Sequence, residues 1–178
     1  MTKSIQVISA SKFATTFSLR PELHAWLLGA GASAASGIPT GYDMILDFKA
    51  KLYCQETRFP RRNVDPSDPL WVQRIDEFFS RTPLLPPAND PTEYAAAFEA
   101  IYPQETHRRQ SIDDAISKGT PCFGHRLLAG LITASKAPCV FTTNFDPLIE
   151  ESSLLAASLM PPGTARKPTV ATLDSANL

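Results

Sequence analysis

The stretch LLGAGASAASGIPTGYDM, from Leu27 to Met44, decides the fold. Two leucines end a short apolar run, a loop of small residues follows, and a helical pattern begins after Pro39. A short apolar run that ends at glycine is typical of a buried parallel strand. A glycine-rich loop between a strand and a helix is typical of a phosphate-binding turn. The stretch therefore predicts a strand, a phosphate loop and a helix in succession.

The glycines of this loop have separate expected roles. Gly29 would permit the tight turn off the strand, and Gly31 would let the backbone approach a pyrophosphate. Ala34 stands where the dinucleotide fingerprint has its third glycine. The alternative is that the small residues only let a helix pack on the strand. An ordinary dehydrogenase needs a second strand with an acidic residue about 20 residues on, but Asp47–Glu56 has helical periodicity. A nucleoside-triphosphate P-loop is excluded because no GK[ST] follows.

The helix after the loop has a clear start. Thr40 and Asp43 have the spacing of a capping box, and the helix should end near Thr57. Its apolar face should consist of Met44, Ile45, Phe48 and Leu52.

Residues 58–119 predict a helical insertion within a single domain, 1–178. Prolines, 16 in the chain, separate its helices. Thr92 is a candidate N-cap, and Gly119 should end the last of these helices. The expected helices cover 71–81, 91–105 and 106–119.

The remainder predicts a helix, a second strand at 139–141, a further helix and a weak strand at 168–173. The first of these helices, 121–136, should bury Leu127, Leu128, Leu131 and Ile132. Strands that alternate with helices indicate an α/β fold with a parallel sheet of the Rossmann type. Because such a sheet usually has five or six strands, we expect the chain to be a fragment, incomplete at its C-terminal end.

A second polar motif, VFTTNFDPLIE, follows the second strand. It places Thr142, Thr143, Asn144 and Asp146 at the carboxyl end, where ligands bind in open α/β sheets. If the two strands are parallel neighbours, both motifs line one crevice. The alternative for Asp146 is that it only caps the following helix.

Composition limits the class of protein. The formal net charge is −1, which indicates neither a nucleic-acid-binding nor a membrane-binding surface. The basic clusters THRRQ and FPRRN are expected to be solvated, with a partner or nucleic-acid contact as the alternative. The three cysteines form no CxxC pair, which predicts reduced thiols, a cytoplasmic location and no metal site.

Three motifs, between Ala25 and Glu150, together resemble the sirtuin family. They are GAGASAASGIP, PCFGHRLLAGL and TTNFD, which resemble the sirtuin loop, histidine-bearing helix and asparagine segment. The chain departs from sirtuin deacylases: Thr40, Gly41 and Tyr42 replace Asp-Phe-Arg, Thr143 replaces Gln, and the zinc-ribbon cysteines are missing. These departures resemble bacterial sirtuin-like domains that hydrolyse NAD⁺ in anti-phage defence. The resemblance implies a helical insertion in place of the zinc ribbon.

The resemblance also implies the site. The backbone of the loop would hold the NAD⁺ pyrophosphate, Asn144 would be catalytic by positioning the ribose or the attacking water, and Asp146 would contact the nicotinamide carboxamide. Thr142 and Thr143 complete the expected NAD⁺-binding set, with no zinc and no other metal. The loop residues concerned are Gly29, Ala30, Gly31, Ala32 and Ser33.

The family's catalytic histidine follows the asparagine segment, but no histidine follows His125 here. His125 matches a helix histidine that is usually structural, His24 should be partly buried, and His107 should be solvated. We therefore expect residues 1–178 to be inactive alone. The expected partner is a second copy, or an effector, HerA-type ATPase or Argonaute subunit or domain. The alternatives are a non-catalytic module that senses NAD⁺ or ADP-ribose and, less favoured, an NAD⁺-dependent deacylase.

Overall fold

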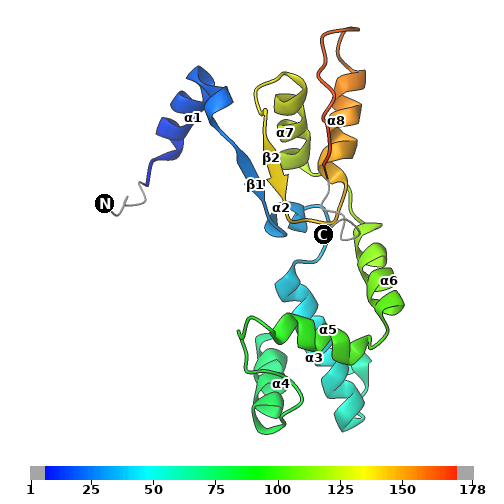
Figure 1. Cartoon of the computed structure of the whole chain (residues 1–178). Coiled ribbons are helices and arrows are strands. Elements are labelled where there is room, and N and C mark those ends of the chain that lie inside the picture. The colour runs from blue at the N-terminus through cyan, green and yellow to red at the C-terminus, as the bar shows by residue number, and fades with distance from the viewer. Residues whose placement is uncertain (1–6, 172–178) are drawn as a thin grey trace. The chain divides into compact units, whose positions relative to one another are not determined.

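The computed structural model in Figure 1 describes residues 7–171. This part of the chain is mostly helical, with eight α-helices, two 3₁₀ helices and one sheet of two parallel strands. It divides into two compact units. The sheet unit comprises the described residues up to Ala32 and from Thr120 onward, and the helical unit comprises Ser33–Gly119. The expected α/β order is present, but helices dominate it.

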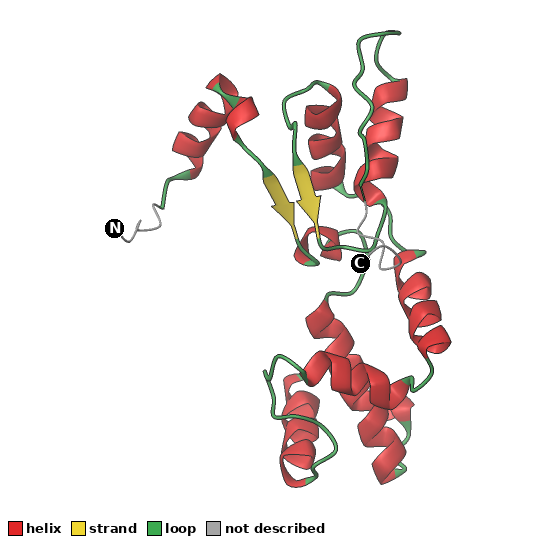
Figure 2. Ribbon diagram, in the orientation of Figure 1, coloured by secondary structure: helices red, strands yellow, loops and turns green. Residues whose placement is uncertain are grey.

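The sheet unit holds both strands (Figure 2). Its elements are α1 (Ala10–Leu19), η1 (Pro21–Leu23), β1 (Trp26–Leu28), α7 (Phe123–Thr133), β2 (Val140–Thr142) and α8 (Leu148–Ser158). The strands are parallel, with Leu27 opposite Phe141. Helix α7 runs opposite to β2, so its first turn lies at the carboxyl end of the sheet (Figure 1). The predicted strands are therefore confirmed, and they are neighbours.

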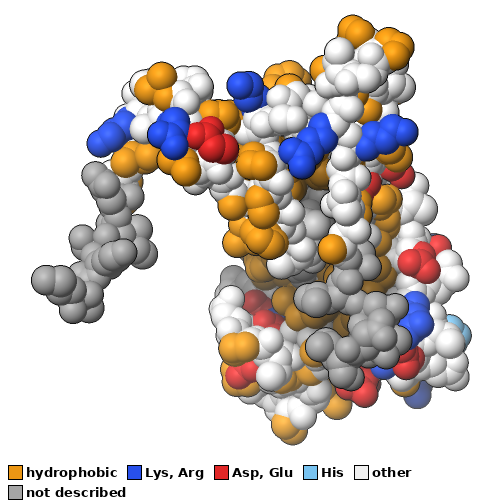
Figure 3. All heavy atoms as spheres, turned by 45° about the horizontal axis from the view of Figure 1, so that its top comes forward, with side chains coloured by type: hydrophobic (Ala, Val, Ile, Leu, Met, Phe, Trp, Pro, Cys, Tyr) orange, Lys and Arg blue, Asp and Glu red, His pale blue; other side chains and the backbone are white. Residues whose placement is uncertain are grey.

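The expected burial of the first strand is wrong. Leu27 is 77% exposed and its partner Phe141 is 59% exposed. Leu27 and Phe141 are cross-strand partners on one face of the sheet, and that face keeps these apolar side chains at the surface. Figure 3 shows hydrophobic side chains gathered at the surface over α1 and β1.

Helices α7 and α8 pack side by side, and their buried face differs from the expected one. Leu128, Ala129 and Thr133 are buried in α7, whereas Leu127 is 54% exposed. Spacings of one and four residues place these three on one helical stripe, to which Leu127 does not belong. Small side chains such as Ala129 and Ser153, which are fully buried, allow close approach of the two helices. No strand occurs at 168–171, and residues 172–173 of the expected strand lie outside the described residues.

The helical unit is built around one long helix. It contains α3 (Gly41–Thr57), η2 (Arg61–Asn63), α4 (Pro69–Arg81), α5 (Glu93–Ile101) and α6 (Glu105–Ile116), while α2 (Gly31–Ala34) crosses its boundary. Helix α3 packs against α4 and α5. The predicted insertion, 58–119, lies inside this unit, which also includes α3.

Local sequence signals explain where these helices begin. Thr40 Oγ1 accepts from Asp43 N at 3.2 Å and Asp43 Oδ2 accepts from Thr40 N at 2.8 Å, which confirms the capping box. Asp68 caps α4 from two residues before Leu70. At α5, Thr92 occupies the N-cap position as predicted, but its side chain makes no cap bond. Asp90 instead accepts from Thr92 N at 2.8 Å.

Aromatic packing fills the core of the helical unit. Phe48 is 2% exposed, and its ring stacks on Phe98 with centroids 4.9 Å apart. Tyr94 and Tyr102 pack against the same ring. A second cluster joins α3 to α4 and consists of Ala50, Leu52, Tyr53, Cys54, Val64, Ile75 and Phe79.

A buried ammonium ties three helices together. Lys49 in α3 donates to Glu93 Oε1 in α5 at 2.9 Å and to Asp76 in α4. Glu93 also accepts from Asn89 N at 2.8 Å. Burial disfavours the charged lysine, but the bonds to Asp76 and Glu93 outweigh it and raise the pKa of Lys49.

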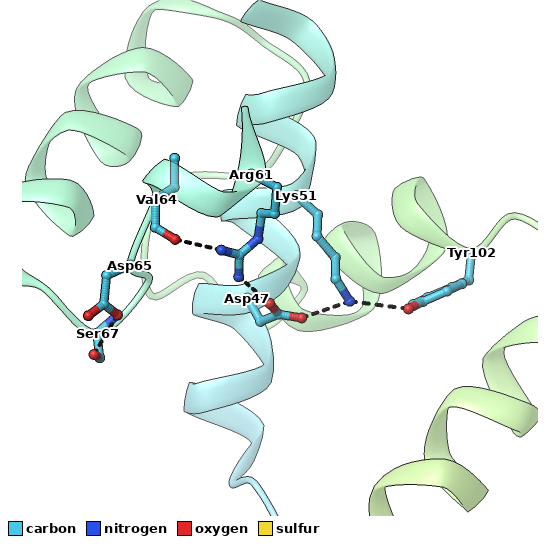
Figure 4. Close-up of polar contacts among 7 residues, drawn as sticks. All are labelled: Asp47, Lys51, Arg61, Val64, Asp65, Ser67 and Tyr102. Carbon is cyan, nitrogen blue, oxygen red and sulfur yellow. Dashed lines mark hydrogen bonds and ion pairs between the residues drawn. The ribbon is translucent and has the colours of Figure 1, made fainter. Parts of the chain in front are cut away.

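A more exposed polar network lies on the same helix (Figure 4). Asp47 Oδ1 accepts from Arg61 at 2.8 Å and Asp47 Oδ2 from Lys51 at 2.8 Å. Lys51 also reaches the hydroxyl of Tyr102 at 3.2 Å. The pKa of Asp47 is lowered, because the bonds from Lys51 and Arg61 outweigh the opposing effect of burial.

The two ends of the helical unit touch. A Cβ on Gly119 would lie 2.7 Å from Ile38 Cδ1, so any larger residue would require the Ile38 side chain to move. Gly119 lies beyond Ile116, the last residue of α6, and its N–H donates to Ile116 O at 2.8 Å. The predicted end of the helix is confirmed, and close packing accounts for the glycine.

Candidate nucleotide site at the carboxyl edge of the sheet

The two sequence motifs meet at one edge of the sheet. Thr143 N donates to Leu28 O at 3.1 Å, directly after the paired strands end. This bond joins residues 115 positions apart in the chain. Since the strands are parallel neighbours, the loop that begins at Gly29 and the segment that begins at Thr143 leave the same end of the sheet. The two strands are thus parallel neighbours, as the prediction of a shared crevice requires.

The glycine-rich loop turns at once into the short helix α2. Gly29, Ala30 and Gly31 are exposed, and Ala32 N donates to Gly29 O at 2.8 Å. Ser33 is 1% exposed and belongs to the helical unit, whereas the four preceding residues belong to the sheet unit.

Neither glycine of the loop is required by the chain itself. The structure gives Gly29 and Gly31 no left-handed φ, unlike Gly37 at +84°. A Cβ at either position would meet no atom within 4 Å. The expectation that Gly29 is needed for a tight turn is therefore wrong. The open space at Gly29 and Gly31 stays compatible with the other expected role of a glycine, close approach of the backbone to another molecule.

The TTNFD segment forms a compact polar turn. Thr142 Oγ1 accepts from Asn144 N at 3.0 Å, and Thr143 Oγ1 lies 3.5 Å from Leu28 O. Asp146 Oδ1 accepts from Leu148 N at 3.3 Å, at the start of α8. The helix-start role of Asp146 is therefore present, and its contact with a carboxamide stays a prediction. Asn144 is half-buried within this turn.

The histidines occupy different surroundings. His24 Nδ1 lies 3.0 Å from Arg20 O, and its ring packs edge-on against Phe13 and Phe17, before β1 begins. It is half-buried as expected, and it lies at the end of β1 opposite to the loop. His107 is exposed on α6, also as expected.

His125 has a neighbour that the sequence did not reveal. It is 3% exposed in the first turn of α7, and its Nδ1 lies 3.1 Å from Cys122 Sγ. The signal was present as a three-residue spacing across the start of a predicted helix, which places the two side chains on one face.

A hollow of about 1,200 Å³ lies within the helical unit, between α3, α4 and the proline-rich segment after α4. Its charged lining residues are Asp43, Lys49, Asp76, Glu77 and Arg81. None of the predicted site residues lines it, so the hollow and the sheet edge are separate features of the molecule.

Comparison with known proteins assigns no relationship: the chain matches no protein-family model and no curated protein sequence. Among residues 7–171, no helix is both long and apolar enough to cross a membrane. The same residues contain no group of three or more His, Cys, Asp or Glu side chains placed to hold a metal ion.

Proposed function

We propose that this chain carries a sirtuin-like, Rossmann-type site that binds NAD⁺ and cleaves its nicotinamide–ribose bond. The products would be nicotinamide and ADP-ribose. The resemblance of the three motifs suggests the reaction, and the lack of the zinc-ribbon CxxC pairs in the sequence favours it over a deacylase.

The bond from Thr143 N to Leu28 O is the observation that carries the proposal. It links TTNFD to the residue directly before GAGASAASGIP, 115 positions away, and the resemblance assigns these two motifs to one dinucleotide. A chance likeness in either motif would not require them to share an edge. Ligands of open α/β sheets bind at this edge, which supports a nucleotide there.

The glycine loop suits the pyrophosphate half of the substrate. At Gly29 and Gly31 the chain leaves the position of a Cβ open, so backbone N–H groups can approach phosphate oxygens closely. A larger side chain at either position would occupy that space.

The TTNFD turn suits the reacting half. The amide of Asn144 offers both a donor and an acceptor, which can orient a ribose hydroxyl or the attacking water. The carboxylate of Asp146 can accept from the carboxamide N–H groups of nicotinamide. The departing nicotinamide is neutral while positive charge develops on the ribose, so positioning and electrostatics would supply most of the acceleration.

The decisive experiment measures nicotinamide release and NAD⁺ binding in parallel, with the protein in its full cellular length. Asn144→Ala should lower NAD⁺ cleavage by roughly 100-fold or more, as loss of a positioned polar group does, while NAD⁺ still binds. Unchanged cleavage by this variant would contradict the proposal. NAD⁺ binding without cleavage by the unaltered protein would favour the sensing module.

Gly31→Ala tests the loop independently. Because the added methyl meets no atom within 4 Å, the variant should unfold at the same temperature as the unaltered protein but bind NAD⁺ more weakly. Gly130→Ala is the matched control, since that position in α7 is equally open and should leave NAD⁺ binding unchanged. Equal NAD⁺ affinity in all three proteins would remove the loop from the site.

The proposed biological role is depletion of NAD⁺ during phage infection, in company with a second copy or an effector, ATPase or Argonaute subunit. Cells that express the full-length protein should lose NAD⁺ on infection, and the Asn144→Ala variant should abolish that loss. Protection of the cells without NAD⁺ loss would again favour sensing over hydrolysis.

A further inference from the structure

Cys122 and His125 form a thiol–imidazole pair at the start of α7. Cys122 is the N-cap residue, with extended backbone angles (φ −79°, ψ 177°). His125 stands three residues on, and its Nδ1 lies 3.1 Å from Cys122 Sγ. The proposed NAD⁺ chemistry uses neither side chain. A nucleophile within hydrogen-bond distance of a base is the arrangement that activates cysteines in proteins.

We propose that Cys122 is a reactive thiol, activated by His125, which small peroxides convert to a sulfenic acid. His125 is 3% exposed. Because its imidazole ring is buried, the ring is held in place beside the sulfur. Cys122 is half-buried rather than enclosed, which leaves a small oxidant a route to the sulfur.

The position at a helix start adds to this activation. Helix α7 has 11 residues, and the partial positive charge of a helix N-terminus favours a thiolate over a thiol. The pair therefore combines a proton acceptor and a favourable field at one sulfur atom.

The oxidation balances with a peroxide as the only co-reactant. His125 Nδ1 takes the proton of the Cys122 thiol, and the thiolate sulfur attacks one oxygen of hydrogen peroxide. A sulfur–oxygen bond forms while the oxygen–oxygen bond breaks, and the departing hydroxide takes the proton back from His125 to leave water. Sulfur is oxidised by two electrons and the peroxide is reduced.

The other two cysteines provide internal controls. Cys139 is exposed but immediately precedes β2, whereas Cys122 lies at the carboxyl end of the same sheet. Cys54 is buried in the helical core, and burial raises the pKa of its thiol. Accessibility alone therefore ranks Cys139 first, whereas the proposed activation ranks Cys122 first.

The same positions determine the fate of the oxidised sulfur within the sheet unit. A disulfide requires Cα atoms within about 7 Å, and Cys122 and Cys139 lie at opposite ends of the sheet. Cys139 therefore cannot resolve a sulfenic acid on Cys122, which a dimedone trap can capture.

The test treats the reduced full chain with one equivalent of hydrogen peroxide in the presence of dimedone, and measures the adduct on each cysteine by peptide mass spectrometry. Cys122 should react about tenfold faster than Cys139 or more, as expected for an activated thiolate, and Cys54 should stay unlabelled. If Cys139 reacts as fast as Cys122 in the unaltered protein, the proposal fails, and this comparison needs no variant.

Two variants separate activation from exposure. His125→Asn removes the proton acceptor and should slow Cys122 to about the rate of Cys139, while the rate at Cys139 stays the same. An unchanged rate at Cys122 in this variant, with Cys54 still protected, would overturn the proposal. Cys139→Ser is the matched control and should leave the rate at Cys122 unaltered. Should His125→Asn unfold and expose Cys54, the comparison within the unaltered protein decides.

Discussion

The two units differ in how well each packs its own interior. The helical unit contains both hydrophobic clusters, which are built from α3, α4 and α5. Among the described residues of the sheet unit, the buried apolar side chains are Pro21, Leu128, Ala129, Ala137 and Leu148. The sheet unit nevertheless carries two of the three motifs that resemble a known family, and the first four residues of the third. Motif content and core content are therefore concentrated in different parts of the chain.

This difference has a physical basis. A long helix such as α3 can bury one stripe against two neighbours, which is enough to enclose Phe48 and Lys49. A pair of strands three residues long has too little area to enclose its own side chains. We therefore expect core substitutions in the helical unit to cost far more stability than equivalent ones on the sheet.

The largest expected effect comes from Phe48→Ala. Removal of this buried ring and its stack on Phe98 should lower the free energy of unfolding by about 4–5 kcal/mol. Denaturant unfolding can be followed by the fluorescence of Trp71 in a Trp26→Phe background, because each unit contains one of the two tryptophans.

The matched substitution on the sheet is Phe141→Ala. This side chain is 59% exposed, so its loss should change the free energy of unfolding by less than about 1 kcal/mol. Equal losses for Phe48→Ala and Phe141→Ala would break the contrast between the two units.

Lys49→Met should have the second largest effect. It leaves the buried carboxylate of Glu93 without a cation, and should cost about 3–4 kcal/mol. Because the pKa of Lys49 is raised, its contribution is complete below the ordinary lysine value of 10.5 and fades as the pH rises through the raised value. Arg109→Ala breaks the exposed pair with Glu105 and should have no measurable effect. A comparable loss of stability in both variants would argue against a special contribution from the buried bonds of Lys49 to Asp76 and Glu93.

Thr40→Ala should have a smaller effect, about 1 kcal/mol, because it opens the capping box of α3. Thr92→Ala is the control, since Thr92 makes no side-chain cap bond. Thermal unfolding of the two variants would sharpen the comparison within the helical unit. A larger loss for Thr92→Ala would show that the capping geometry does not decide stability here.

Asp47→Asn should have a small effect that disappears in acid. The lowered pKa of Asp47 means that its contribution is complete above the ordinary value of 3.8 and is lost as the pH falls through the lowered value. The free energy of unfolding of Asp47→Asn should therefore differ from that of the unaltered protein above the lowered pKa of Asp47, and the two should converge below it. The difference should stay under about 1 kcal/mol, because the network is partly exposed. A gap that persists in strong acid would assign the effect to something other than charge.

Local signals in the sequence predicted the elements well. The apolar run before Gly29, the Thr40–Asp43 spacing and the polar tip after Phe141 mark features that the structure contains. The parallel pairing of the strands also followed from their alternation with helices. Each of these features depends on a few neighbouring residues or on a general rule of chain connection.

Features that depend on distant partners could not be predicted in the same way. The partners of Lys49, Asp76 and Glu93, lie 27 and 44 positions away in the chain. No local pattern shows that these side chains meet. The exposure of Leu27 depends on which elements cover its face of the sheet. Likewise, the register of the buried stripe on α7 depends on α8, so Leu127 was assigned to the wrong face.

The contact between Ile38 and Gly119 bears on the order in which the chain folds. Pairing of β1 with β2 must close a loop of more than 100 residues, and the entropy lost rises with the length of that loop. Once the helical unit has folded, its two ends touch, so the loop that remains to be closed consists of residues 29–37 and 120–139, the second of which includes α7. We therefore expect the helical unit to fold first and the two strands to pair afterwards.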